Sequence, residues 1–137
     1  MGQERSRRRR SWGADREESG EHDLGPVTGY PQGEPVAVDL GRRRLVVVRD
    51  GERVFALRDV CPHQGAALSA GRVISTCRLH REDGGWVQTD LRALQCPWHG
   101  WSFGLEDGQA LFDDVGTRVR SYPARVAGGR VRVRVEP

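Results

Sequence analysis

The alternation of apolar and polar residues is clearest near the C-terminal end of the chain. Residues 131–135 read Val-Arg-Val-Arg-Val, which is the period of a strand with one buried and one solvated face. The glycine pair at 128–129 joins this segment to the more apolar residues 122–126. The pattern therefore predicts an antiparallel hairpin that closes the domain.

Similar short apolar runs occur earlier in the chain. Residues 36–40 and 45–48 flank a Gly-Arg-Arg-Arg segment, and Asp50-Gly51 is a turn signal that leads into residues 54–57. No amphipathic run of helical length follows residue 25, and 18 Gly and 7 Pro oppose long helices. We therefore expect an all-β fold, an antiparallel sandwich or barrel of short strands.

Composition divides the 137 residues into a tail and one domain. Residues 1–25 are polar and are expected to form a disordered tail, and residues 26–137 to form the domain. Every one of the 22 basic residues is Arg, but the six in residues 1–24 are cancelled by six acids. The run at 7–10 is thus interpreted as solvated chain, and nucleic acid is not expected as a partner. No apolar segment suits an export signal or a membrane span, so a cytoplasmic protein is expected.

Two segments between the predicted strands carry the residues of a metal site. Cys61 and His63 are two positions apart in the first segment, and Cys96 and His99 are three apart in the second. Two Cys and two His suit either a zinc ion or a [2Fe–2S] cluster in which two His replace two Cys on one iron. A zinc finger usually takes two like ligands from each segment, whereas here each segment is mixed. This favours the cluster.

The paired motif, Cys-x-His and Cys-x-x-His with glycine soon after each histidine, resembles that of Rieske iron–sulfur domains. The resemblance covers most of residues 26–137 and implies a Rieske-like β fold with a two-loop cluster-binding subdomain. It further implies one [2Fe–2S] cluster per chain, with Cys61 and Cys96 on one iron and His63 and His99 on the other. The continuation after Gly100, Trp101-Ser102-Phe103, is similar to that of ferredoxins and oxygenase components of this family.

From this resemblance we expect an electron-transferring ferredoxin component that passes electrons from a flavin-dependent reductase to a terminal oxygenase. The chain itself is expected not to be an enzyme, because outside the motifs only His22 and His80 remain to build a mononuclear iron site. The small Rieske subunit of a reductase such as nitrite reductase, and a redox-sensing accessory protein, stay open as alternatives.

The chain departs from the family in the spacing of its two segments. Thirty-two residues separate His63 from Cys96, and the excess corresponds to a polar insertion at about 75–90, with a turn expected at 83–85. This insertion contains Cys77 and His80, a rival Cys-x-x-His pair. We reject the rival because Arg81 follows it, whereas close approach to a cluster favours glycine.

Several residues near the motifs affect the expected redox properties. The disulfide-forming cysteines of high-potential relatives are replaced here by Ala66 and Trp98, and hydroxyl donors by Trp101 and Phe103. Fewer hydrogen bonds to the cluster sulfurs predict a potential at the low end of the Rieske range, about −150 mV, that falls at alkaline pH as the imidazoles lose protons. Trp98 and Trp101 are also candidates for shielding the cluster from water.

Overall fold

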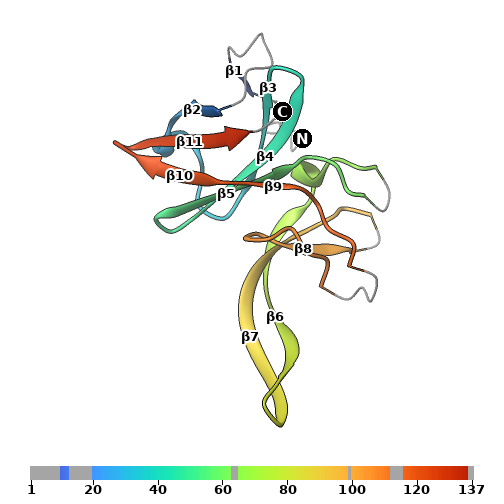
Figure 1. Ribbon diagram of the computed structural model, residues 1–137. Coiled ribbons are helices and arrows are strands. Elements are labelled where there is room, and N and C mark those ends of the chain that lie inside the picture. Colours follow the sequence, from blue (N-terminus) through green and yellow to red (C-terminus); the bar gives the residue numbers. More distant parts are fainter. Residues whose placement is uncertain (1–9, 13–19, 63–64, 99, 112–115, 136–137) are drawn as a thin grey trace.

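The computed structural model is built on three β-sheets (Figure 1). It describes residues 10–12, 20–62, 65–98, 100–111 and 116–135. The prediction of an all-β fold is confirmed. All strand pairs are antiparallel except β1 with β3. The only helices in these residues are single 3₁₀ turns, η2 (Val27–Gly29) and η3 (Leu68–Ala70). No helix there is long and apolar enough to cross a membrane.

The largest sheet has five strands in the order β1-β3-β4-β5-β9. Their bounds are β1 (Arg10–Trp12), β3 (Pro35–Leu40), β4 (Arg43–Asp50), β5 (Arg53–Arg58) and β9 (Ser121–Tyr122). The turns between β3 and β4 and between β4 and β5 begin at Gly41 and Gly51, which have φ of 62° and 67°. Both hairpins that the glycines predicted are therefore present, because glycine adopts this left-handed conformation without strain.

A second sheet has the order β10-β11-β2 and lies beside the first (Figure 1). Its strands are β10 (Ala124–Ala127), β11 (Arg130–Val135) and β2 (Gly20–Pro26). The predicted C-terminal hairpin is β10–β11, joined through Gly128-Gly129. Strands β1 and β2 correct one expectation. Residues 10–12 and 20–25 fall in the segment expected to be a disordered tail, and instead they pair with β3 and β11.

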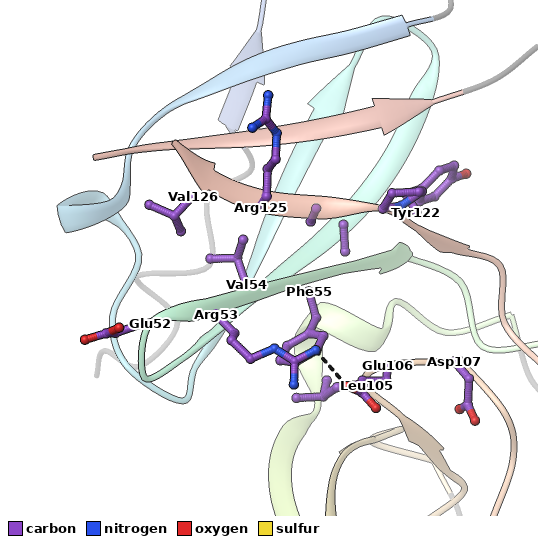
Figure 2. A pocket seen from close by; sticks show the side chains of 13 residues that line it. Glu52, Arg53, Val54, Phe55, Leu105, Glu106, Asp107, Tyr122, Arg125 and Val126 are labelled. Atoms are coloured by element: carbon purple, nitrogen blue, oxygen red, sulfur yellow. Dashed lines mark hydrogen bonds and ion pairs between the residues drawn. The ribbon is translucent and has the colours of Figure 1, made fainter. Parts of the chain in front are cut away.

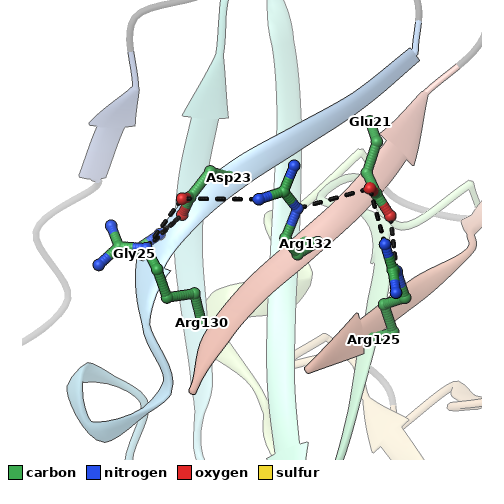
Figure 3. Close-up of polar contacts among 6 residues, drawn as sticks. All are labelled: Glu21, Asp23, Gly25, Arg125, Arg130 and Arg132. Carbon is green, nitrogen blue, oxygen red and sulfur yellow. Dashed lines mark hydrogen bonds and ion pairs between the residues drawn. The ribbon is translucent and has the colours of Figure 1, made fainter. Parts of the chain in front are cut away.

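Ion pairs explain how such a polar segment joins a sheet (Figure 3). Arg125 donates to both carboxylate oxygens of Glu21, at 2.7 and 2.9 Å, and Arg130 lies 2.8 Å from Asp23. Arg132 lies between the two acids, 3.5 Å from Glu21 and 3.8 Å from Asp23. The acids of β2 thus acquire partners from strands more than 100 residues away in sequence.

A hydrophobic core lies between these two sheets. It contains Leu24, Tyr30 and the inward-facing residues of β3, β4, β5 and β11, all 9% exposed or less. The alternating valines of β11 face this core as predicted, and Val131, Val133 and Val135 have no exposed surface.

The third sheet, β6-β7-β8, projects from the rest of the molecule (Figure 1). It comprises β6 (Arg72–Glu82), β7 (Gly85–Gln95) and β8 (Ser102–Gly104). The insertion is therefore a regular hairpin of two eleven-residue strands, turning at Asp83 and Gly84 as expected. A second core at the base of this hairpin contains both Cys61 and Cys96.

A groove of about 660 Å³ separates the N-terminal half of β5 from β10 and from the segment after β8 (Figure 2). Arg53 reaches across it to Glu106, with a contact of 2.6 Å, and its guanidinium lies 4.7 Å from the centre of the Phe55 ring. Among the described residues, neither cysteine segment contributes to its lining.

Candidate metal centre

The first cysteine loop begins shortly after β5 and is closed by two main-chain hydrogen bonds. The N–H of Cys61 donates to the carbonyl of Ala66 at 2.8 Å, and the N–H of Gly65 donates to the carbonyl of Cys61 at 2.7 Å. Gly65 has φ of 75°, which explains why glycine stands at this position. The loop is therefore a tight turn with Cys61 at its start.

The second cysteine loop begins directly after β7 and repeats part of this construction. The N–H of Cys96 donates to the carbonyl of Trp101, five residues later, at 2.6 Å. Gly100, four residues after the cysteine, has φ of 72°. In addition, the N–H of Trp98 lies 3.4 Å from the Cys96 sulfur, where it can donate a hydrogen bond. The two loops thus share one closing hydrogen bond and a left-handed glycine at the same offset from the cysteine, although their histidines stand at different offsets.

Folding brings the two cysteine side chains together. Cys61 and Cys96 are 0% and 2% exposed and belong to the same core. Burial raises the pKa of the Cys96 thiol, opposed by the N–H of Trp98, and the neighbouring Cys61 thiol raises that pKa further. Two adjacent sulfurs in apolar surroundings favour deprotonation only when a cation compensates their charge. This donor pair fits one iron of a two-iron cluster.

The remaining predicted ligands, His63 and His99, lie outside the described residues. Pro62 and Pro97, which directly follow the two cysteines, are exposed, so each loop passes from a buried cysteine to the molecular surface. Trp98 is 58% exposed and therefore does not form a buried shield. The second candidate, Trp101, packs against the core and stacks on Phe103 with 6.3 Å between ring centres.

The rival pair in the insertion has the wrong geometry for a shared metal. Cys77 and His80 stand three residues apart on β6, so their side chains lie on opposite faces of the hairpin. His80 instead lies 3.0 Å from Glu82. Within the described part of the chain, no group of three or more His, Cys, Asp or Glu residues is arranged to hold a metal.

Asp59 fastens the first loop to the 3₁₀ turn that follows it, a role that the sequence did not reveal. One carboxylate oxygen accepts the Ser69 N–H and the other accepts the Ser69 hydroxyl, both at 2.7 Å. Both residues are buried, Asp59 at 1% and Ser69 at 7% exposure. The segment that carries Cys61 is thus held at both ends, ten residues apart. The signal in the sequence is an acid two positions before a candidate cysteine, and this signal could have identified Asp59 as a supporting residue.

The bases of the two loops also touch, through a second feature that sequence reasoning missed. The main chain of Gly71 packs so closely on Gln95 that a Cβ atom built at Gly71 would lie 1.8 Å from the Gln95 carbonyl oxygen. Beside this contact, Arg72 donates through Nε to the Gln95 side-chain carbonyl at 3.1 Å. The exit of the first loop is therefore fixed against the residue that precedes Cys96.

Comparisons with known proteins agree with this geometry. The family model described as "Rieske [2Fe-2S] domain" matches residues 21–123. The ferredoxin subunit of anthranilate 1,2-dioxygenase from Burkholderia cepacia is 32% identical over 114 residues, covering 83% of this chain and 91% of that protein.

Two solved structures are similar along most of their length. The first is described as a small subunit of NADH-dependent nitrite reductase from Mycobacterium tuberculosis. It has a TM-score of 0.68 and 28% identity, covering 88% of this chain and all of that one. The ferredoxin of carbazole 1,9a-dioxygenase from Nocardioides aromaticivorans has a TM-score of 0.66 and 25% identity, covering 86% and 100%.

Proposed function

Because this chain belongs to the Rieske [2Fe–2S] domain family, we propose that it is a one-electron carrier, the ferredoxin component of an oxygenase system. Its cofactor is the [2Fe–2S] cluster of that family, which supplies reversible one-electron reduction when bound. The observation that carries the proposal is the pair of buried cysteines, held side by side by two loops that share a closing hydrogen bond five residues long. The similarity to a dioxygenase ferredoxin along most of both chains supports the assignment to an oxygenase system.

We further propose that Cys61 and Cys96 bind one iron and that His63 and His99 bind the other. The thiolates occupy the second core, and the segments that lead to the histidines pass toward solvent. With these ligands, the imidazole-bound iron would lie nearer the surface than the thiolate-bound one, where an electron could enter and leave.

The surface around the cysteine loops is suited to brief contacts with redox partners. Pro62, Pro97 and Trp98 are exposed there, and none of them carries a charge. Small and weakly charged contacts release a partner quickly, as a shuttle between a flavin-dependent reductase and a terminal oxygenase requires.

Paired variants test the ligand assignment. Cys96→Ser and His99→Ala should abolish the visible absorption and the reduced-state EPR signal, because each removes one ligand. Cys77→Ser and His80→Ala are the matched controls, since they alter the same motif within the insertion, and both should retain about two iron atoms per chain. If only the Cys77 and His80 variants lost the cluster, the second pair of ligands would be Cys77 and His80 of β6.

Reconstitution tests the carrier function. The holoprotein is mixed with a flavin-dependent reductase, NADH and the oxygenase component encoded nearest to it, and product formation is measured against the concentration of the carrier. Product should depend on the carrier and should disappear with Cys96→Ser. If the reductase supplies the oxygenase equally well without this protein, the proposal is wrong.

A second candidate function is that of an accessory subunit in a nitrite reductase. The observation that favours it is the similarity, over 88% of this chain, to a small subunit of that kind. A stable complex with a large catalytic subunit, purified through this chain and active in NADH-dependent nitrite reduction, would support it over the ferredoxin role.

A further inference from the structure

The outer edge of β6 is a long strand edge without a partner strand in the described residues. β6 is the first strand in the order β6-β7-β8, and it pairs with β7 without interruption from Arg72 to Glu82. Eleven residues correspond to about 36 Å of edge, along which main-chain N–H and C=O groups face outward. β6 contains neither proline nor a bulge, two of the features that usually prevent such an edge from pairing.

The far end of the same hairpin also exposes large apolar side chains. Leu79 and Trp86 are 61% and 65% exposed, and they share one face of the hairpin, as the register of β6 with β7 shows. Arg81 lies over the Trp86 ring, 5.2 Å from its centre. This surface lies on the hairpin that projects from the rest of the molecule in Figure 1.

We propose that β6 pairs antiparallel with β6 of a second copy of this chain, about a twofold axis that passes through Cys77. Two identical strands that pair antiparallel are related by such an axis, so every favourable contact occurs twice. The result is one continuous six-stranded sheet, β8-β7-β6 followed by β6-β7-β8 of the second copy. Neither cysteine loop contributes a residue to this strand pair.

The charges on β6 select this register. When the full strands overlap, Cys77 is opposite its own copy and Arg72 is opposite Glu82 of the second copy, on the same face of the sheet. The symmetry forms this opposite-charge pair at both ends of the interface. Leu79 is then opposite Ser75, and no two like charges are opposite each other.

Neighbouring registers lack this complementarity. Moving the axis by one residue toward the tip leaves Arg72 without an opposite residue and places Glu82 opposite Ile74, so both opposite-charge pairs are lost. Moving it one residue the other way, to Thr76, leaves Glu82 with no opposite residue and places Arg72 opposite His80. The full overlap is thus the register that both length and charge favour.

Sedimentation equilibrium of the holoprotein tests the proposal. We expect a dimer at about 10–100 μM. Arg72→Glu and Glu82→Arg should each raise the dimer dissociation constant about tenfold or more, because each creates two like-charge pairs. The double variant, Arg72→Glu with Glu82→Arg, restores opposite charges and should return the dissociation constant to near its original value. The visible spectrum serves to check that every variant is loaded.

Cross-linking through Cys77 then tests the position of the axis. Directly opposite residues in antiparallel strands have Cα atoms about 4.5–5.5 Å apart, so a short bismaleimide should join the two Cys77 thiols and yield a covalent dimer. Cys77→Ser should yield none, since Cys61 and Cys96 are buried. A holoprotein that is monomeric at about 100 μM overturns the proposal. So does a dimer that fails to cross-link through Cys77, or a double variant as weak as the single ones.

Discussion

Gly71 shows at the scale of one residue how little space separates the two cysteine loops. A Cβ atom at this position would lie 1.8 Å from the carbonyl oxygen of Gln95 and 3.2 Å from that of Leu68, and main-chain atoms of this kind have little freedom to move. The position requires glycine because of the close approach, and its backbone conformation is not the left-handed one.

We predict that Gly71→Ala lowers the free energy of unfolding by about 2 kcal/mol or more and weakens retention of the cluster, because it forces Gln95 away from the first loop. Urea unfolding and iron content after gel filtration measure the two effects. Gly85→Ala is the control, since a Cβ atom there meets nothing within 4 Å. Equal effects of the two substitutions would contradict the steric explanation.

Asp59 permits a second prediction at this scale. Asp59→Ala removes the acceptor of two hydrogen bonds from Ser69 and should destabilise the holoprotein by about 2–3 kcal/mol. Ser69→Ala removes one of these bonds and should cost about 1 kcal/mol. Unfolding curves give the stability, and the rate at which visible absorption disappears under an iron chelator reports how well the first loop is held. The first loop is not fastened by Asp59 if both variants lose iron at the rate of the unaltered protein.

At the scale of elements, β2 depends on charge for its attachment to the C-terminal strands. Hydrogen bonds from arginine lower the pKa of Glu21, through Arg125, and that of Asp23, through Arg130. Lowered pKa values in the folded state mean that the unfolded chain binds more protons in acid, so stability falls as the pH falls. The contribution is complete above the ordinary values of 4.5 and 3.8, and it is lost as the pH drops through the lowered values.

The double variant Glu21→Gln with Asp23→Asn should therefore be less stable than the unaltered protein at about pH 6, and this difference should shrink toward about pH 3. Denaturant midpoints along this range measure it. Glu52→Gln is the matched control, because Glu52 is exposed and lies outside the ion-pair network of Figure 3. If the difference in stability does not change with pH, the variant is destabilised by altered side-chain packing and not by the lost charges.

The strands that the sequence predicted and those it missed differ in how they are buried. β3, β4, β5, β10 and β11 combine apolar runs with glycine turns, and all of them were predicted. β6 and β7 were not, because most of their length is solvated on both faces and therefore shows no alternation. β2 was missed because its acids look like a polar tail until the arginines of β10 and β11 are placed beside them.

At the scale of the whole molecule, the division into two cores predicts how the protein responds to loss of its cluster. Cys61 and Cys96 belong to the second core, whereas the first core lies between the five-stranded sheet and the β10-β11-β2 sheet. A metal that joins two loops stabilises the part of the fold that contains them. Removal of iron should therefore loosen the second core first.

Hydrogen exchange of the protein before and after iron removal tests this expectation. Amide protection should fall around Leu68, Leu94 and Phe103 of the second core and should persist around Val47 and Val133 of the first. Uniform loss of protection would instead mean that the whole molecule unfolds as one unit without its cluster.

The candidate site was predictable from sequence because its chemistry is local. Each cysteine, its histidine and its glycine stand within five residues of one another, so the motif is legible before folding. The groups that support the loops are less local. Asp59 and Ser69 are ten residues apart, and Gly71 meets Gln95 across the whole insertion, so nothing in the linear pattern connects them.

The sequence by itself determined the two candidate metal-binding segments, the all-β class and the hairpins that end in glycine, because each depends on residues that are close together in the chain. Only the tertiary structure decided that the two cysteines meet in one core, that Cys77 and His80 lie on opposite faces, and that residues 20–26 belong to a sheet. These outcomes depend on long-range packing and on ion pairs between distant strands, and no local pattern of residues encodes either of them.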